Sequence, residues 1–454
     1  MNINDAKKIF VLGLAKSGRA VSLLLARHGF AVRVWDDTAD ARNGFPPPAG
    51  STHATGDLEI VTQAVCERVL DDCDCLVVSP GVPLDHPLVR RAMSRSIDVM
   101  GELEVAFQFS KARVIAVTGT NGKSTVTDLI GAILGSAGVP SVVAGNIGTP
   151  FSSVLLEGHV EDTVVLEVSS FQLDTIDRFR ADIAILLNIT PDHLDRYGDS
   201  FDRYAASKHR ILNRSDGGSF FVYNAEDALC SSFADGFPGT AMPFSSARTL
   251  GTGTFSRGDT LVRAMGGRET IIIHRKDFMP AGIHNLENAL AAIAAVSPLD
   301  IPQDALERAL KQYRPLPHRM ELVQVAGGVA YINDSKATNI DAAAKSLQSI
   351  ADGVIVILGG RDKNGDFTTL IPFLGRVKAA VLIGEAAEKI DSAIGGSCRV
   401  IHASTMEDAV QLARSTAVAG DTVLLAPACA SFDMFANYKE RGDEFKRCVK
   451  SIMV

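Results

Sequence analysis

The sequence predicts an α/β protein of three domains, each built around a mainly parallel sheet. Its 454 residues are 46% hydrophobic, so the chain can bury a sizeable core, and this length is typical of about three domains. Short aliphatic and β-branched runs alternate with helical stretches, the pattern of parallel strands joined by crossover helices. Many of these runs stop at glycine-containing loops, where α/β proteins bind ligands. We expect domains at residues 1–110, 111–315 and 316–454.

Composition narrows the class of function. The chain has 45 lysines and arginines against 53 acids, a net charge of −8, which disfavours nucleic acid as a partner. Its seven cysteines are scattered without a Cys-x-x-Cys pair, as expected for reduced thiols rather than a disulfide framework or a zinc site. The sequence has no apolar run of about 18 residues and no apolar signal segment near its start. We therefore expect a cytoplasmic monomer without membrane insertion.

The first domain opens with a Rossmann-like strand, turn and helix. A strand at Lys8–Leu12 enters a glycine turn and a helix, and a second strand, Ala31–Trp35, ends in Asp36 and Asp37. An acid about 20 residues past such a turn holds a ribose in dinucleotide sites. Ala15 replaces the middle glycine, however, and restricts the approach of a pyrophosphate. NAD and another nucleotide diphosphate in a shifted pose both remain open.

A further strand of this domain, Cys75–Ser79, breaks at Pro80 and Gly81. This break places another loop at the carboxyl edge of the sheet, where such folds bind ligands. Gly44–Gly50 is rich in proline and is expected to be a surface loop.

The second domain begins with a P-loop-like motif. An apolar strand, Val114–Thr118, is followed by a glycine loop and a helix that starts at Lys123. The N–H groups of Gly119–Ser124 are expected to point into the loop and, with the positive helix end, to favour a polyphosphate, which we take to be ATP. In such loops the lysine reaches the β- and γ-phosphates and the hydroxyl of Ser124 reaches Mg²⁺. Val117 occupies the first glycine position of the strict P-loop pattern, so the pattern is incomplete.

Polar residues follow other strands of this domain. Asn146 lies between glycines, where its amide can bind a diphosphate or a substrate amide. Glu167 lies in the apolar run Thr163–Ser170, where a charge is costly unless it is paired or holds a metal. His193 follows the strand Ala181–Asn188 at the P-loop edge, although a lone histidine is more often a surface or core residue than a ligand.

The rest of this domain carries weaker signals. Ser200 is expected to cap a helix that carries Lys208, which by itself is an ordinary solvated lysine. Another helix opens at His284 and carries Asn285 and Asn288, of which Asn285 also fits a capping role. The glycine-rich, strand-like pieces between residues 214 and 282 predict a peripheral sheet.

The third domain follows a proline-stiffened linker at 314–319 and is predicted to be a second doubly wound, Rossmann-like sheet. Polar loops follow three of its strands, at residues 333–339, 359–363 and 427–433, and no P-loop occurs there. The predicted strands are Val329–Ile332, Val354–Leu358, Ala379–Ile383, Val400–His402 and Thr422–Leu425.

Together these motifs resemble the Mur ligase family, whose members are ATP-dependent ligases that add amino acids to the peptidoglycan precursor. The resemblance runs through all three domains and is closest to the members that join D-glutamate to UDP-N-acetylmuramoyl-L-alanine. Its main segments are Gly-Thr-Asn-Gly-Lys-Ser-Thr ending at Thr125, Gly-Asn-Ile-Gly around Asn146, Leu-Glu-Val-Ser-Ser-Phe-Gln-Leu from Leu166, Asn-Ile-Thr-Pro-Asp-His-Leu-Asp-Arg-Tyr from Asn188, and Ala-Ala-Ser-Lys ending at Lys208.

The resemblance implies the chemistry and the residues that perform it. ATP phosphorylates the substrate carboxylate, and the amine of D-glutamate attacks the resulting acyl phosphate. The catalytic residues implied are Lys123, Glu167, His193, Lys208 and Arg319. Mg²⁺, in two sites, is implied at Ser124, Glu167, His193 and a carbamylated Lys208, because a carbamate offers anionic oxygens where an ammonium would repel the ion.

The resemblance also implies three sets of binding residues. The ATP-binding residues are Gly119, Thr120, Asn121, Gly122, Lys123, Ser124, Thr125, Asn285, Asn288, Arg319, Asp334 and Lys336. The residues for the UDP-linked substrate are Ala15, Lys16, Ser17, Asp36, Asp37, Ser79, Gly81, Asn146 and His193. The residues for D-glutamate are Thr338, Lys363, Ser431, Phe432 and Tyr438.

The chain departs from the family pattern at two of these positions. Lys16 stands where the family has an apolar residue, and Tyr438 stands where it has phenylalanine, which adds a hydroxyl to the wall of the amino-acid pocket. Three other interpretations stay open: an NAD-dependent oxidoreductase, a P-loop switch that hydrolyses ATP without forming a bond, and a sister ligase such as a folylpolyglutamate synthase. The loops around Lys363, Ser431 and Tyr438 favour D-glutamate among the ligases.

Overall fold

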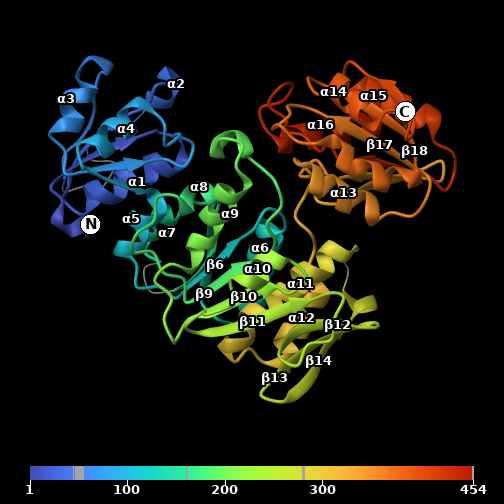
Figure 1. Cartoon of the computed structure of the whole chain (residues 1–454), viewed down its shortest axis with the longest axis horizontal. Coiled ribbons are helices and arrows are strands. Elements are labelled where there is room, and N and C mark those ends of the chain that lie inside the picture. Colours follow the sequence, from blue (N-terminus) through green and yellow to red (C-terminus); the bar gives the residue numbers. More distant parts are fainter. Residues whose placement is uncertain (44, 46–55, 147, 160–161, 279–281, 452–454) are drawn as a thin grey trace. The chain divides into compact units, whose positions relative to one another are not determined.

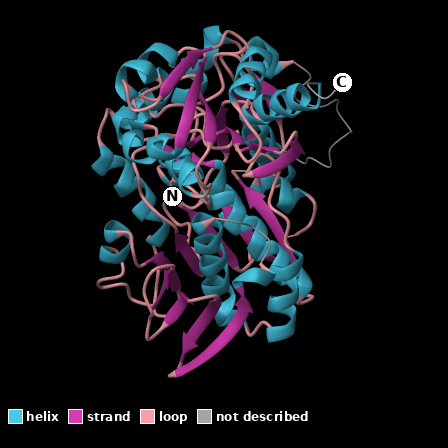
Figure 2. Cartoon of the chain, turned by 90° about the vertical axis from the view of Figure 1, so that its right-hand side faces the viewer, coloured by secondary structure: helices cyan, strands magenta, loops and turns pink. Residues whose placement is uncertain are grey.

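The structure, a computed structural model, describes residues 1–43, 45, 56–146, 148–159, 162–278 and 282–451. The chain packs into two compact units. Unit 1 comprises Met1–Ile189, Ala205–His274 and Ala289–Leu310, and unit 2 comprises Thr190–Tyr204, Arg275–Asn288 and Lys311–Val454. Both units are α/β, with strands lying between helices (Figure 1, Figure 2).

The first part of unit 1 is a parallel sheet with the strand order β3-β2-β1-β4-β5. β1 and β4 lie in its middle and are almost entirely buried, which explains their continuous apolar sequences. The strands are β1 (Lys8–Leu12), β2 (Ala31–Trp35), β3 (Leu58–Ile60), β4 (Cys75–Val78) and β5 (Asp98–Gly101). The helices are α1 (Lys16–Arg27), α2 (Ala39–Arg42), α3 (Cys66–Asp71), α4 (Pro87–Ser94) and α5 (Glu102–Phe109).

The strands predicted at β1, β2 and β4 are confirmed. β3 was not predicted, because it is short and its side chains are only partly buried. The loop predicted at Gly44–Gly50 lies outside the described residues except for Phe45, which is buried.

The second sheet of unit 1 has the order β14-β13-β12-β11-β10-β9-β6-β8-β7. Its strands are parallel from β7 to β12, and β12, β13 and β14 are antiparallel to one another. The strands are β6 (Val114–Thr118), β7 (Ser141–Gly145), β8 (Thr163–Glu167), β9 (Ile183–Leu186), β10 (Phe220–Asn224), β11 (Thr240–Ser245), β12 (Gly253–Arg257), β13 (Thr260–Met265) and β14 (Arg268–His274).

This sheet corrects one prediction. The pieces between residues 214 and 282 do not form a separate peripheral sheet, because β10 pairs in parallel with β9 and continues the central sheet. The helices along this part of the chain are α6 (Lys123–Ser136), α7 (Phe151–Leu156), α8 (Ser170–Leu173), α9 (Phe201–His209), α10 (Ala228–Ser232), α11 (Ile283–Val296) and α12 (Gln303–Gln312).

Helix α5 joins the two sheets of unit 1 through a buried carboxylate. Glu104 is fully buried, and its oxygens accept the N–H groups of Asp177, Arg178 and Phe179 at 2.8–3.0 Å, just before β9. Two residues earlier, Glu102 accepts the N–H of Ser152 in the first turn of α7 at 2.7 Å. Both acids are therefore fixed to the second sheet although they follow the last strand of the first.

Unit 2 contains a sheet with the order β15-β16-β20-β17-β18-β19, parallel except for β15. Alternate side chains of its central strands pack on α13 and α14 on one face and on α15 and α16 on the other. The strands are β15 (Glu321–Ala326), β16 (Val329–Asn333), β17 (Val354–Gly359), β18 (Val377–Ile383), β19 (Arg399–His402) and β20 (Thr422–Leu425). The helices are α13 (Ile340–Gln348), α14 (Ala387–Ile394), α15 (Met406–Thr416) and α16 (Tyr438–Ser451).

The five strands predicted here are confirmed, and the strand order has a consequence for the site. Because β20 lies between β16 and β17, the three polar loops that follow these strands emerge side by side at one edge of the sheet. Short 3₁₀ helices complete the fold at η1 (Ile3–Asp5), η2 (Gln63–Val65), η3 (Leu194–Tyr197), η4 (Arg210–Leu212), η5 (Arg275–Asp277), η6 (Ser297–Leu299) and η7 (Phe367–Arg376).

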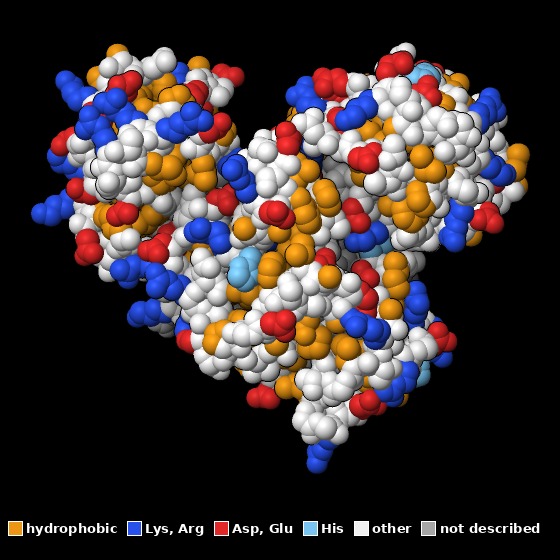
Figure 3. All heavy atoms as spheres, in the orientation of Figure 1, with side chains coloured by type: hydrophobic (Ala, Val, Ile, Leu, Met, Phe, Trp, Pro, Cys, Tyr) orange, Lys and Arg blue, Asp and Glu red, His pale blue; other side chains and the backbone are white. Residues whose placement is uncertain are grey.

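Charged side chains are spread over the visible surface of the chain (Figure 3), and its helices are short. On the face in Figure 3, basic and acidic side chains are intermixed, with hydrophobic side chains between them. None of the helices in the described part of the chain has the length and apolar character that a membrane span requires.

Candidate functional site

The P-loop-like motif forms the expected strand, loop and helix. β6 is fully buried between β8 and β9, and α6 starts at Lys123 as predicted. Gly122, the residue before the helix, has φ of 89°, a left-handed conformation that glycine adopts without strain. The loop therefore turns sharply enough to direct the first turn of α6 towards the carboxyl edge of the sheet.

Two lysines converge on one carbonyl of this loop. Lys123 donates from Nζ to the carbonyl oxygens of Gly119 at 2.8 Å and Thr120 at 2.9 Å. Lys208, on α9, is 2% exposed and also donates to the carbonyl of Gly119, at 2.8 Å. The predicted loop lysine and the lysine singled out only by family resemblance thus lie at the same point. The ammonium of Lys123 gives this loop a positive charge that suits phosphate.

The expectation for the loop N–H groups is wrong at two positions. The N–H of Thr120 donates to the backbone oxygen of Asn188 at 2.9 Å, and the N–H of Asn121 donates to the side-chain oxygen of Asn188 at 2.8 Å. Asn188 also donates from Nδ2 to the carbonyl of Asn121 at 3.1 Å. Sequence reasoning missed this role, although Asn188 follows β9, the neighbour of β6. The N–H groups of the first turn of α6 remain the donors suited to phosphate.

Glu167 ends β8 directly beside the loop strand, in register with Val117 of β6. Its carboxylate is 2% exposed, and Oε1 accepts Nδ2 of Asn146 at 2.7 Å. Gly145 makes this approach possible: its φ is 107°, and a Cβ there would lie 2.3 Å from the carbonyl oxygen of Glu167. The structure thus joins Asn146, predicted for the substrate, to Glu167, predicted for the metal.

The donors at this edge suit magnesium. Ser124 and Glu167 are both buried at the carboxyl edge of the second sheet and offer the hydroxyl and carboxylate oxygens that Mg²⁺ prefers. Among the described residues no three His, Cys, Asp or Glu side chains come together to hold a metal by themselves. A magnesium ion at this edge would therefore also need oxygens from phosphate and water. His193 lies in unit 2, and its role as a metal ligand stays a prediction.

In unit 2, Asp192 lies next to three polar side chains. Its Oδ1 accepts Nζ of Lys363 at 3.1 Å, and its Oδ2 accepts Nδ2 of Asn339 at 3.1 Å. Nε2 of His193 lies 3.5 Å from the same Lys363 ammonium. Burial raises the pKa of Asp192, but the charges of Lys363 and His193 and the bonds from Asn339 and Lys363 outweigh it and hold the pKa well below its usual range. Sequence reasoning selected Lys363 and His193 and missed Asp192 and Asn339.

The three loops beside β16, β17 and β20 are bonded to one another. The N–H of Gly359 donates to Pro427 at 2.8 Å, the N–H of Arg361 donates to Ala430 at 2.9 Å, and the N–H of Ala428 donates to Ala337 at 2.9 Å. These loops carry the predicted D-glutamate residues Thr338, Lys363 and Ser431.

The side chains on these loops differ in exposure. Ser431 is buried, whereas Phe432 is 63% exposed. Nζ of Lys336 lies 4.6 Å from the ring centroid of Tyr438, a cation–π contact between residues predicted for ATP and for D-glutamate.

The residues predicted around the nucleotide in unit 2 have mainly internal partners. Asp334 is buried and accepts the hydroxyl of Ser346 and the N–H of Met320 at 3.3 Å, and burial raises its pKa. It therefore fixes the backbone next to the half-buried Arg319. Asn285 and Asn288 are buried in α11, which starts at Ile283. Asn285 is thus inside the first turn, and the idea that it caps the helix is wrong.

In the first sheet, some predicted residues build the loop and others line it. Asp36 accepts the N–H of Leu14 at 2.6 Å, and the hydroxyl of Ser79 donates to the carbonyl of Gly13 at 2.8 Å. The turn allows no side chain at Gly18, whose Cβ would lie 1.8 Å from the carbonyl oxygen of Gly13. Exposed or half-buried positions that a ligand can reach are Ala15, Lys16, Ser17, Asp37 and Gly81.

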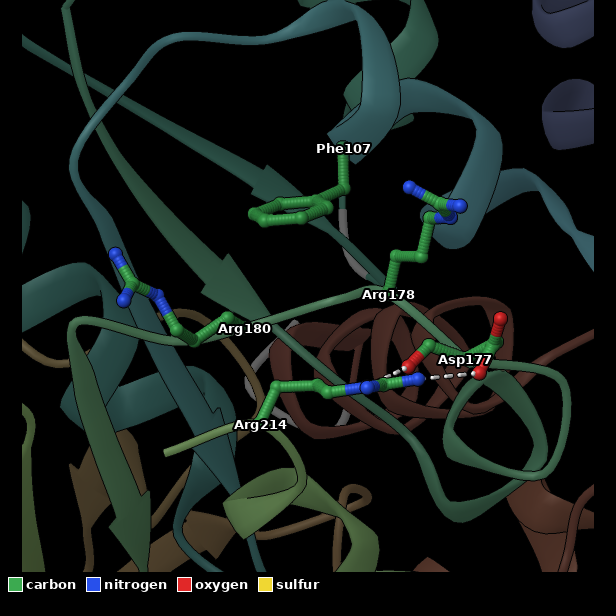
Figure 4. A pocket seen from close by; sticks show the side chains of 5 residues that line it. All are labelled: Phe107, Asp177, Arg178, Arg180 and Arg214. Carbon is green, nitrogen blue, oxygen red and sulfur yellow. Dashed lines mark hydrogen bonds and ion pairs between the residues drawn. The ribbon is translucent and has the colours of Figure 1, made fainter. Parts of the chain in front are cut away.

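A cavity of about 470 Å³ lies at the other edge of the second sheet (Figure 4). It is lined by Phe107, Asp177, Arg178, Arg180 and Arg214, at the amino end of β9, whereas the P-loop contacts its carboxyl end. Arg214 already pairs with Asp177 at 3.0 Å, and Arg180 pairs with Asp216. The cavity is therefore not our candidate site.

Family models match consecutive parts of the chain. The model described as Mur ligase MurD-like, N-terminal domain matches residues 7–101, the Mur ligase middle domain matches residues 117–296, and the Mur ligase glutamate ligase domain matches residues 318–429. Two similar curated proteins are each called UDP-N-acetylmuramoylalanine--D-glutamate ligase. The protein of Koribacter versatilis is 42% identical over 451 residues, 98% of each chain. That of Acidobacterium capsulatum is 43% identical over 449 residues, 98% of this chain and 96% of the relative.

Solved structures show the same fold at low identity. A pseudomurein peptide ligase type C from Methanothermus fervidus matches with a TM-score of 0.63 at 18% identity, over 98% of this chain and 100% of that one. UDP-N-acetylmuramate-alanine ligase from Thermotoga maritima matches with a TM-score of 0.61 at 18% identity and the same coverage. The predicted three-domain α/β architecture is confirmed. With full-length relatives above 40% identity and family models along its length, the chain belongs to the Mur ligase family.

Proposed function

We propose that the chain is an ATP-dependent ligase that joins D-glutamate to UDP-N-acetylmuramoyl-L-alanine, with release of ADP and phosphate, in peptidoglycan precursor synthesis. The observation that carries the proposal is the convergence of Lys123 and Lys208 on the carbonyl of Gly119, at a loop that leads into a helix amino terminus. This arrangement suits the polyphosphate of ATP. The names of the full-length relatives supply the substrates.

The reaction requires activation of a carboxylate, which is a poor electrophile because its charge is delocalised. Transfer of the γ-phosphoryl group of ATP to this carboxylate gives an acyl phosphate with a good leaving group. Lys123 and Arg319 stabilise the charge that develops on the transferring phosphoryl group, a matter of positioning and electrostatics. The amine of D-glutamate then attacks the acyl carbon, and phosphate leaves as the amide forms.

Magnesium belongs to the same proposal. Ser124 and Glu167 would hold it, with His193 and a carbamylated Lys208 as further ligands in two sites. Bound there, Mg²⁺ would neutralise negative charge on the phosphates. Lys208 itself is buried beside the loop, where its amine is shielded from bulk water.

The amino acid and the UDP-linked substrate are assigned to different sheets. The ammonium of Lys363 and the hydroxyls of Thr338 and Ser431 would bind the carboxylates of D-glutamate, with Phe432 and Tyr438 beside them. The loop held by Asp36 and Ser79 in the first sheet would bind the uridine diphosphate. On this proposal residues 1–110, 111–315 and 316–454 contribute one substrate site each, and the enzyme acts as a cytoplasmic monomer.

The test is phosphate release from ATP with Mg²⁺, UDP-N-acetylmuramoyl-L-alanine and one amino acid at a time. Release is expected with D-glutamate and not with L-glutamate, L-alanine or no amino acid. Mass spectrometry of the product must show an amide of the UDP-linked substrate. Release that needs no amino acid would instead indicate a P-loop ATPase, and release with L-glutamate and a folate would indicate a folylpolyglutamate synthase.

A further inference from the structure

The side chain of Arg441, in the first half of α16, is buried deep in unit 2. It is 2% exposed, and no carboxylate of the described residues lies within ion-pair distance of it. Asp433 acts on Arg441 through its charge without forming an ion pair, so the N–H groups of this buried guanidinium must bond neutral acceptors. Burial lowers the pKa of Arg441 to about 10, so the group is still charged near neutral pH.

The acceptors of Arg441 belong to two of the polar loops. On the loop after β16, Nη2 donates to the carbonyl of Ser335 at 2.8 Å and Nε donates to its hydroxyl at 3.0 Å. On the loop after β20, Nη1 donates to the carbonyls of Cys429 at 3.1 Å and Ala430 at 3.2 Å. One side chain from a helix thus ties together loops about 100 residues apart in the sequence.

The third loop shares one of these acceptors. The carbonyl of Ala430 also accepts the N–H of Arg361, which follows β17. The hydroxyl of Ser335 in turn donates to the carbonyl of Tyr438 at 2.8 Å, the first residue of α16. Arg441 is therefore at the centre of a network that touches every loop assigned to D-glutamate.

We propose that Arg441 is a positioning residue that holds the loops after β16 and β20 in register for D-glutamate. The inference rests on the proposed function and adds a residue that does not touch substrate. Ser335 lies three residues before Thr338, and Ala430 immediately precedes Ser431, the residues of these two loops that we assign to D-glutamate. A shift of either carbonyl would move the neighbouring binding side chain.

The geometry requires arginine rather than any cation. The planar guanidinium presents donors in several directions at once, whereas the ammonium of lysine is a single point on a flexible stem. A lysine at this position would reach one loop and leave carbonyls of the other without a donor. Arg441→Lys keeps the positive charge but removes the planar set of donors, and therefore separates the effects of these two features.

The first experiment measures KM separately for each substrate in Arg441→Lys and Arg441→Met. KM for D-glutamate is expected to rise about tenfold in the lysine variant and further in the methionine variant, with KM for the UDP-linked substrate within about twofold of wild type. Arg447→Met is the matched control, because Arg447 lies on the same helix, is exposed and pairs with Glu444 at 2.6 Å. Unchanged KM for D-glutamate, or equal changes for all substrates, would overturn the proposal.

The second experiment does not depend on activity. Hydrogen–deuterium exchange of Arg441→Lys is expected to speed up in residues 334–338 and 427–431 and to stay unchanged in 119–125. Faster exchange throughout unit 2, or in neither loop, would show that Arg441 does not act on these loops. If wild type is inactive with D-glutamate but both loops still respond, the proposed function fails while the positioning role stands.

Discussion

Lys363 and Asp192 form an ion pair in which Nζ lies 3.1 Å from Oδ1, with side chains only 19% and 8% exposed. The lysine is on the loop after β17, and the acid is in the segment after β9 that belongs to the same compact unit. A carboxylate already faces the ammonium that we assign to D-glutamate. The pair therefore both orients the lysine and offsets its charge.

Removing one partner of this pair is expected to cost more stability than removing both. Lys363→Met leaves Asp192 buried without its main counter-charge and should destabilise unit 2 by about 2 kcal/mol. The double variant Lys363→Met with Asp192→Asn should regain most of this lost stability, because no unpaired charge remains. Urea unfolding of Lys363→Met, of Asp192→Asn and of the double variant measures their free energies of unfolding. Additive losses would mean that the pair has little coupling energy.

The same variants separate stability from function. Lys363→Met and the double variant should both lose affinity for D-glutamate by at least about tenfold, although the double variant regains stability. If the double variant regained activity with its stability, Lys363 would have only a structural role.

Lys123→Ala is expected to reduce phosphate release by about 10²–10³-fold, because the loop loses a cation aimed at the transferring phosphoryl group. Lys111→Ala serves as control, since Lys111 is an exposed lysine shortly before β6. Circular dichroism must show that both variants fold. Full activity in Lys123→Ala would exclude the loop as the site of ATP.

Carbamylation of Lys208 predicts a dependence on carbon dioxide. Wild-type activity should fall in buffer stripped of CO₂ and return on addition of bicarbonate, with a carbamate signal in ¹³C NMR when labelled bicarbonate is used. Lys208→Arg keeps a positive charge but forms no carbamate, and it should be inactive in both buffers. A wild-type rate that is indifferent to CO₂ would contradict this assignment.

The stability of unit 2 is expected to fall in acid because of the partly buried His284. Burial, followed by the charges of Lys345 and Arg319, lowers the pKa of His284 to about 4. The unfolded chain takes up this proton near the ordinary pKa of about 6.5, so stability is fully present above that pH. It is lost as pH falls towards 4, by at most about 3 kcal/mol.

Urea unfolding near pH 7.5 and near pH 5 checks this dependence. His284→Gln should lose less stability between the two values than wild type. His402→Gln is the control, because His402 is an exposed histidine of the same unit that bonds Asp391 at 2.7 Å. An equal pH response in His284→Gln would assign the acid sensitivity to other groups.

The fold was predictable where local sequence decides it. β2 and β6 coincide with their predicted ranges. β6 is a fully buried strand whose apolar run stops at Gly119, and β2 places apolar residues at its buried positions and stops at Asp36. β15 was missed because it is an outer strand with exposed apolar residues, Leu322 at 60% and Val325 at 59%. Such a strand lacks the alternation that marks a half-buried one.

The site was predictable only in part, because several of its residues act through contacts distant in sequence. Asn188 binds the loop 67 residues before it, and Arg441 binds a loop 106 residues before it. Neither contact leaves a local pattern. Lys208 was found only through resemblance to a family, since nothing in its helix distinguishes it from a solvated lysine.

The contacts of Glu104 determine where the chain can be cut into fragments that keep their hydrogen bonds. A fragment that starts after α5 would deprive the N–H of the buried Phe179 of its acceptor. A cut between β5 and α5 would keep the bonds of Glu104 and would break only the bond from the N–H of Gly101, the last residue of β5, to the carbonyl of Thr175 at 3.2 Å. The boundary that best separates the first sheet from the second therefore lies before α5 rather than after it.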